Sequence, residues 1–97
     1  MDDYQSPIAK EQIERLALLA AVNAELRGIA KFISGLETAH EAESEILRSP
    51  ILDEEERGAR LIKLNEIENT IYYLRERAKN LRAIGQEFVL KAKPEAA

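Results

Sequence analysis

Apolar residues recur at alternating steps of three and four along most of this 97-residue chain, and this spacing constrains the fold more than any other feature. Such a repeat places one narrow apolar seam along an α-helix, as in coiled coils. No segment alternates apolar and polar residues over the length of a strand, so the chain is predicted to be all-α. The seam comprises Leu19, Val22, Leu26, Ile29, Ile33, Leu36 and His40, joined upstream by Ile13 and Leu16, and then Leu64, Ile67, Ile71, Leu74, Ala78, Leu81, Gly85 and Phe88.

Three prolines mark the expected helix boundaries. Ser6-Pro7 and Ser49-Pro50 each combine a serine that can cap a helix with a proline suited to the first helical turn. Pro94 ends the periodic pattern. We therefore expect two long helices, at about 7–47 and 50–93, in a single helical domain (1–97) whose ends, 1–6 and 94–97, are frayed. Two seams joined by a short turn predict an antiparallel helical hairpin.

Gly35 offers a structural alternative. Helices of this length are uncommon in compact domains, and a glycine in a helix interior costs about 1 kcal/mol relative to alanine. A break near Gly35 would give a three-helix domain in place of the hairpin.

Polar residues replace apolar ones in the seam near the turn. The predicted register places Glu43 close to Arg57 and His40 close to Arg60. A polar layer of this kind lowers stability but can fix the register of the two helices. Beyond the layer we expect an apolar tip formed by Ile46, Leu47, Ile51 and Leu52.

Residues outside the seam predict a second contact surface. A single hairpin has little core, and Tyr72 and Tyr73 occupy outer positions that the seam does not cover. Phe32 flanks the seam, while Gly28 and Gly35 lie on the back of the first helix, where close approach of another backbone would explain them. We expect these residues to bind a partner protein, and we expect two hairpins to pair into a homodimeric four-helix bundle.

Charge is segregated along the chain. Residues 37–56 carry eight acidic side chains and one arginine, whereas residues 75–93 carry six basic and two acidic side chains. The turn end of the hairpin is therefore predicted to recognise a basic protein surface. Its contact residues would be Glu41, Glu45, Glu54 and Glu55. Residues 75–93 are the candidate footprint for nucleic acid, although the formal net charge of −4 disfavours phosphate binding.

No combination of residues predicts a catalytic site. The chain has no cysteine, which excludes a thiolate nucleophile and Cys-ligated metals. Glu37 and His40 have the Glu-x-x-His spacing of di-metal helical bundles, and Glu56 would be a further ligand. Because Arg57 and Arg60 occupy the facing positions and would repel a cation, we expect no metal and no other cofactor.

These patterns favour a non-enzymatic protein interaction module: an adaptor, a small chaperone, or an inhibitor or regulator. Two alternatives stay open, a carboxylate and histidine di-metal bundle and a nucleic-acid-associated regulator that uses residues 75–93. The longest apolar run, residues 16–22, is shorter than the roughly 20 residues of a membrane helix. The acidic N-terminus lacks the basic region of a signal peptide. We therefore expect a cytoplasmic protein that does not bind membranes.

Overall fold

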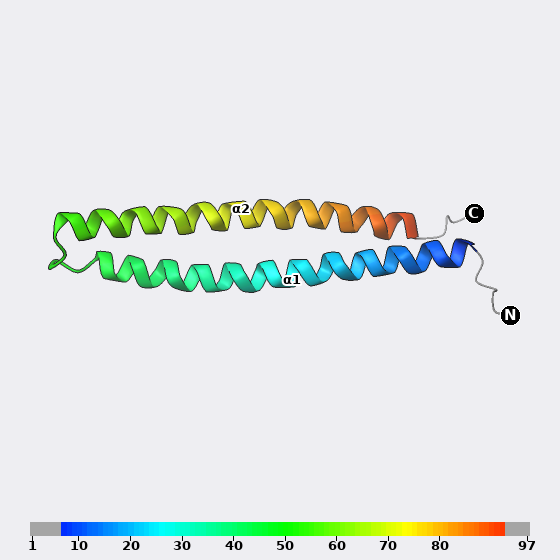
Figure 1. The fold of residues 1–97 in the computed structure, drawn as a ribbon, viewed down its shortest axis with the longest axis horizontal. Coiled ribbons are helices and arrows are strands. Elements are labelled where there is room, and N and C mark those ends of the chain that lie inside the picture. Colours follow the sequence, from blue (N-terminus) through cyan, green and yellow to red (C-terminus); the bar gives the residue numbers. More distant parts are fainter. Residues whose placement is uncertain (1–6, 93–97) are drawn as a thin grey trace.

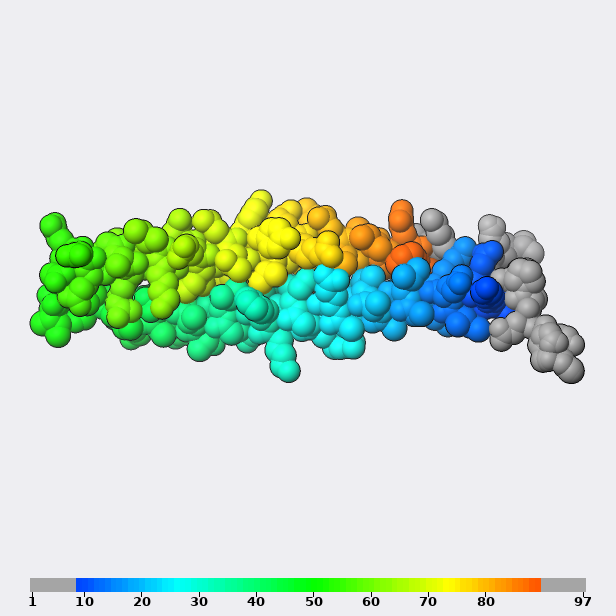
Figure 2. Space-filling view, viewed as in Figure 1, coloured from blue at the N-terminus to red at the C-terminus, as the bar shows by residue number. Residues whose placement is uncertain are grey.

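The protein folds into two long antiparallel helices joined by a short turn (Figure 1). The computed structural model describes the backbone of residues 7–92 and the side chains of residues 9–89. The helices are α1 (Pro7–Leu47) and α2 (Glu54–Ala92). They lie side by side along a rod of 74 × 29 × 15 Å (Figures 1 and 2). The predicted all-α helical hairpin is confirmed.

α1 passes through Gly28 and Gly35 without interruption. Neither glycine has a positive φ, so neither adopts a conformation closed to other residues. The surrounding alanines, leucines and charged residues are strong helix formers, which offsets the cost of the two glycines. The alternative of a three-helix domain with a break near Gly35 is therefore wrong. α1 begins at Pro7 as predicted, while its expected capping residue, Ser6, lies outside the described residues.

α2 begins at Glu54, one helical turn later than the predicted start at residue 50. Asp53 forms a capping box with Glu56. The Glu56 amide donates to Asp53 Oδ1 at 2.8 Å, and the Asp53 amide donates to Glu56 Oε1 at 3.4 Å. Ser49 does not cap a helix, because its Oγ accepts from the Ile51 amide within the turn. The capping box prevails because it satisfies two free amides where a lone serine satisfies one.

Arg57 connects the start of α2 to the end of α1. Its Nη1 donates to the Leu47 carbonyl at 2.6 Å, and its Nη2 donates to the Ser49 carbonyl at 3.0 Å. Carbonyls at the end of a helix lack partners within the helix. Arg57 supplies donors for them and thereby holds the turn closed. The predicted contact between Arg57 and Glu43 is wrong.

The core is a single row of side chains between the helices. Ile29, Ala78 and Leu81 form its buried centre, and no described side chain is less than 2% exposed. Each helix faces only one neighbour, so each buries one stripe and leaves the rest of its surface in water. Ile67 and Ile71 extend the buried row toward the turn.

The buried seam is shorter than predicted at both ends. Ile13 and Leu16 are more than half exposed, so the upstream extension of the seam is wrong. Consecutive steps of three residues carry them around α1 and away from α2. At the turn, Ile51 is 88% exposed. The predicted apolar tip is therefore reduced to the half-buried Leu47 and Leu52.

Candidate interaction surfaces

An ion pair crosses the helix interface close to the turn. Both carboxylate oxygens of Glu43 lie 3.0 Å from Arg60 Nη1, and Lys63 Nζ lies 3.8 Å from Glu43 Oε2. Glu43 is 7% exposed, which makes it the most buried charged residue of the described chain. The sequence predicted a polar layer here but assigned Arg57 to Glu43. The actual partner lies about one helical turn farther along α2, because α2 starts one turn later than expected.

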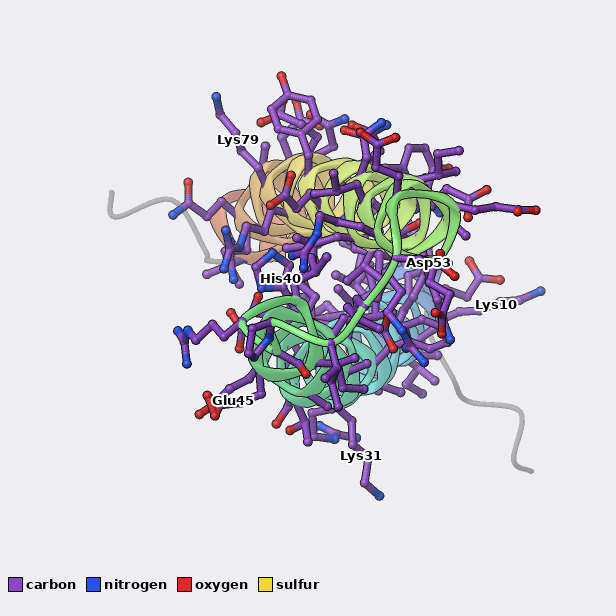
Figure 3. The ribbon with its side chains drawn as sticks, turned by 90° about the vertical axis from the view of Figure 1, so that its left-hand side faces the viewer. Lys10, Lys31, His40, Glu45, Asp53 and Lys79 are labelled. Atoms are coloured by element: carbon purple, nitrogen blue, oxygen red, sulfur yellow. The ribbon has the colours of Figure 1, made fainter. Side chains whose placement is uncertain are left out.

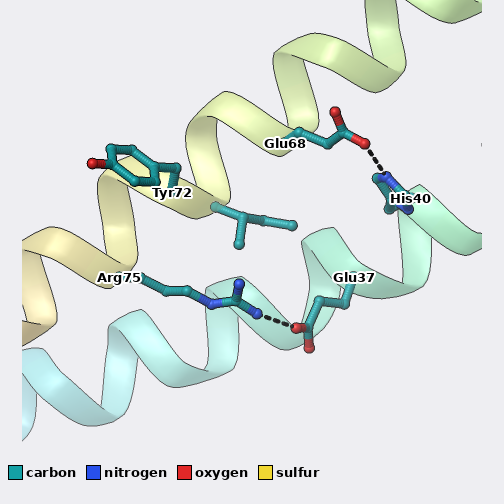
Figure 4. Close-up of a pocket in the computed structure, with 6 residues that line it drawn as sticks. Glu37, His40, Glu68, Tyr72 and Arg75 are labelled. Atoms are coloured by element: carbon teal, nitrogen blue, oxygen red, sulfur yellow. Dashed lines mark hydrogen bonds and ion pairs between the residues drawn. The ribbon is translucent and has the colours of Figure 1, made fainter.

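Glu37 and His40 lie in a shallow cleft between the helices, about 320 Å³ in volume (Figure 4). His40 Nε2 lies 2.8 Å from Glu68 Oε2, and Arg75 Nη2 donates to Glu37 Oε2 at 2.8 Å. Tyr72 stands at the edge of the cleft (Figure 4). Each polar group meets a partner on the opposite helix, so these contacts join α1 to α2.

The cleft does not assemble the metal ligands considered from the sequence. Glu37 is bound by Arg75, and Glu56 belongs to the capping box at the start of α2. Among the described residues, no group of three or more His, Asp, Glu or Cys side chains is placed to hold a metal ion. His40 contacts Glu68, and its predicted contact with Arg60 is wrong.

A groove with a basic rim continues along the interface from this cleft, and we call it the basic groove. Its apolar floor includes Leu26, Ile29, Ile33 and Ala78, and Arg75, Lys79 and Arg82 line its α2 side. A second hollow adjoins it through Leu26 and Arg82 and reaches Gly85. On the α1 side, Arg27 and Ala30 line a neighbouring hollow, and Ala30 also lines the basic groove. Within the described chain, no ion pair involves Arg27, Lys79 or Arg82.

Sequence reasoning found the basic segment 75–93 but not the groove. Two of the segment's cations pair across the hairpin, because Arg75 binds Glu37 and Arg77 Nη2 lies 3.0 Å from Glu25 Oε2. The signal for the groove was the presence of Ala78 and Gly85 at seam positions. Small side chains at a helix interface leave space that larger ones would fill.

The outer face of α1, defined here by Leu18, Gly28, Phe32, Gly35 and Ile46, is apolar and uncovered. Phe32 is 59% exposed, and it lines an apolar hollow with Gly35 and Leu36. Leu18 and Ile46 are also exposed. Each lies four turns from Phe32 at about 3.5 residues per turn, so the three side chains share one face of α1. A Cβ atom on Gly28 or Gly35 would meet nothing within 4 Å. The close backbone approach predicted at these glycines is therefore not made within one hairpin.

The remaining predicted contact residues all lie at the surface. Tyr72 and Tyr73 are 68% and 66% exposed. Successive helical residues point in directions about 100° apart, so the two rings cannot serve one flat contact equally. The four carboxylates predicted at the acidic turn are exposed, and one of them forms an ion pair with Arg48; they are Glu41, Glu45, Glu54 and Glu55.

Comparisons with known proteins add no relative. A scan against protein-family models, a search of curated proteins and a search of solved structures each found no match. Neither helix contains, within the described residues, a stretch long and apolar enough to cross a membrane. The surfaces of the hairpin therefore carry the functional inference.

Proposed function

We propose that this protein is a non-enzymatic interaction module, in which the outer face of α1 docks an apolar segment of a partner protein. The observation that carries the proposal is the exposed Phe32 between two glycines that have open space above them. Glycine lets a neighbouring backbone approach closely. An aromatic side chain beside it supplies the area for a central contact, since Phe, Tyr and Trp each bury roughly 150–250 Å².

The thin core supports the same proposal. A hairpin that buries one row of side chains gains little from hydrophobic burial compared with a larger domain. Covering the outer face of α1 would add Leu18, Phe32 and Ile46 to the buried apolar surface. Docking of an apolar helix along a helical face is a common mode of recognition, with anchors spaced by whole turns.

The acidic turn fits a partner with a basic surface. Glu41, Glu54 and Glu55 are exposed and take part in no ion pair within the described chain. Exposed like charges gathered at one end accelerate encounter with an oppositely charged partner more than they add to affinity. The proposal includes a cytoplasmic location, which the cysteine-free composition supports.

Affinity purification from the native host with mass spectrometry tests the proposal. The tagged protein is compared with Phe32→Glu, which places a charge in the docking face, and with Ile62→Glu as the matched control. Ile62 has a similar exposure and lies on α2. We expect a specific protein that is captured by the parent and by Ile62→Glu and is lost with Phe32→Glu. Equal capture by both variants, or no specific capture at all, would contradict the proposal.

A further inference from the structure

Among the described residues, one side of the hairpin carries positive charges without ion-pair partners in its open half and negative charges without ion-pair partners in its turn half. Lys79 and His40 lie toward this side in the end-on view, whereas Lys10 projects toward the opposite side (Figure 3). The basic groove opens on the same side, with Arg82 in its lining on α2. On α1, Arg27 lines an adjoining hollow that shares Ala30 with the groove.

The helical repeat places acidic residues on the same side, nearer the turn. Seam residues seven apart keep facing α2 along this hairpin, as Leu26 and Ile33 do, so residues separated by multiples of seven share a side. Glu41 follows Arg27 by fourteen residues on α1, and Glu54 precedes Arg82 by twenty-eight on α2. Glu41 and Glu54 are exposed and take part in no ion pair within the described chain.

These positions satisfy one twofold axis. In a symmetric dimer, residue i of one copy contacts residue j of the other, and j contacts i. Pairing Arg27 with a second copy's Glu41 puts the axis at the level of Ser34 on α1. Pairing Arg82 with a second copy's Glu54 puts it at the level of Glu68 on α2. The two levels agree to within about one to two turns. Glu68 contacts His40 and lines the cleft with Glu37, and these two residues of α1 lie only six and three positions from Ser34.

We infer that two copies of this chain associate antiparallel through the side that carries the basic groove, with the acidic half of each copy seated on the basic half of the other. Arg27 then faces Glu41 of the second copy, and Arg82 faces its Glu54. The same symmetry brings the exposed Leu61, which lies in line with Glu54 and Glu68, over the apolar floor of the basic groove.

The contact area is sufficient for a specific dimer. The stretch of α2 from Glu54 to Arg82 is about 42 Å long at ~1.5 Å per residue, and two helices side by side are about 20 Å wide. Their product, about 800 Å² per copy, matches a standard specific interface. Tyr72 lies one turn from the axis and becomes covered, which suits an aromatic near the centre of an interface.

The axis also brings together the two Glu68 carboxylates, a like-charge contact that opposes association. Each of these carboxylates is within hydrogen-bonding distance of a His40 ring. The two pairs of opposite charges that the symmetry creates, each present twice, outnumber this repulsive contact. Because all of these charges are exposed, their attraction is expected to weaken with salt.

This inference rests on the proposed function only in taking the hairpin to act through its helix faces, and it uses a different face from the one that contains Phe32. In the dimer Glu41 and Glu54 bind the second copy, so the encounter with a basic partner at the acidic turn falls to Glu55. A monomer that still shows Phe32-dependent capture would overturn the dimer and leave the proposed function intact. A dimer with the predicted charge dependence and no captured partner would support the dimer and contradict the proposed function.

The test is sedimentation equilibrium of the full chain at about 20 mM and about 500 mM NaCl, where the Debye length falls from roughly 20 Å to 4 Å. We expect a dimer at low salt whose dissociation constant rises about tenfold at high salt. Arg27→Glu should weaken the dimer at least tenfold, and adding Glu41→Arg to the same chain should restore it, because the exchange recreates two opposite-charge pairs. Lys10→Glu makes the same change of charge on the opposite side of the hairpin (Figure 3) and should alter the dissociation constant less than twofold.

Circular dichroism of each variant establishes that the helices remain folded. A monomer at every concentration, a dimer indifferent to Arg27→Glu, or a loss that Glu41→Arg does not reverse would overturn the inference. Equal weakening by Lys10→Glu would also overturn it, because the effect would then follow net charge alone. A monomer that binds a duplex DNA probe, with binding lost in Arg82→Glu, would assign the groove to nucleic acid instead.

Discussion

Glu43 and Arg60 form the most buried charged contact between α1 and α2, with both carboxylate oxygens 3.0 Å from the same guanidinium nitrogen. Glu43 is enclosed, whereas the Arg60 side chain is 36% exposed. Removing the arginine would leave a desolvated carboxylate without its partner, and an unpaired buried charge strongly destabilises the folded state. The contact therefore penalises any slip of one helix along the other.

Glu43→Ala is expected to lower the free energy of unfolding by about 2 kcal/mol, because Arg60 loses its partner at the helix interface and the space of the buried Glu43 side chain is left empty. Replacing both Glu43 and Arg60 by leucine should cost much less, since an apolar pair needs no desolvated charge. Urea unfolding of the single and double variants measures both effects. Glu66→Ala, a change at an exposed carboxylate that takes part in no ion pair within the described chain, is the control and should stay within about 0.5 kcal/mol. Equal effects of Glu43→Ala and Glu66→Ala would refute this role.

Arg57→Ala is expected to loosen the turn. The substitution removes both donors to the Leu47 and Ser49 carbonyls and should destabilise the protein by about 1–2 kcal/mol. Hydrogen exchange of the amides around the end of α1 should accelerate more than exchange in the centre of the helices. Arg48→Ala, which loses only an exposed contact with Glu45, should leave those amides unchanged. Unaltered exchange in Arg57→Ala would show that the turn does not depend on this side chain.

Asp53→Ala and Ser49→Ala test which residue starts α2. Loss of the capping box should cost about 1 kcal/mol, whereas loss of the Ser49 hydroxyl should cost less than about 0.5 kcal/mol. Thermal unfolding monitored by circular dichroism separates the two variants. The reverse order would restore the helix start expected from the Ser49-Pro50 pair.

Gly35→Ala separates folding from docking. A Cβ at this position meets nothing within 4 Å, so the variant should gain about 1 kcal/mol from helix propensity. If the outer face of α1 docks a partner closely, the same variant should capture less of it. Gly85→Ala is the control inside the hairpin, where a Cβ would lie 3.5 Å from Val22 Cγ1, an ordinary contact. It should stabilise the protein without reducing capture, and urea unfolding at high salt measures both stabilities.

The helices themselves were predictable because their signals are local. The three-four spacing and the scarcity of helix-breaking residues identify α1 and α2 and their antiparallel pairing. The start of α2 was misassigned because two capping signals compete within five residues, and only the Asp53–Glu56 box satisfies two amides. That error shifted the expected register by one turn, and so Arg57 was given the partner of Arg60.

The surfaces were less predictable, because each depends on both helices at once. Tyr72 and Tyr73 were placed outside the seam, and Phe32 beside it, from their positions on a single helix, and all three are exposed. The pairing of Arg75 with Glu37 and of His40 with Glu68 depends on the axial alignment of α1 and α2, which the sequence pattern leaves undefined by about a turn. The basic groove needs, in addition, the small residues Ala78 and Gly85 opposite Ile29 and Val22.

Sequence alone determined that the chain forms two long amphipathic helices with an acidic turn and a basic open half, because propensity, spacing and charge are properties of residues near one another. Tertiary structure decided which opposite charges neutralise each other and which stay free. That choice depends on distances of a few ångströms across the interface, set by the length of the turn and the start of α2. Within the described chain, the charges of Arg27, Glu41, Glu54 and Arg82 take part in no ion pair once those internal pairs are made, and it is these charges that the proposed dimer would use.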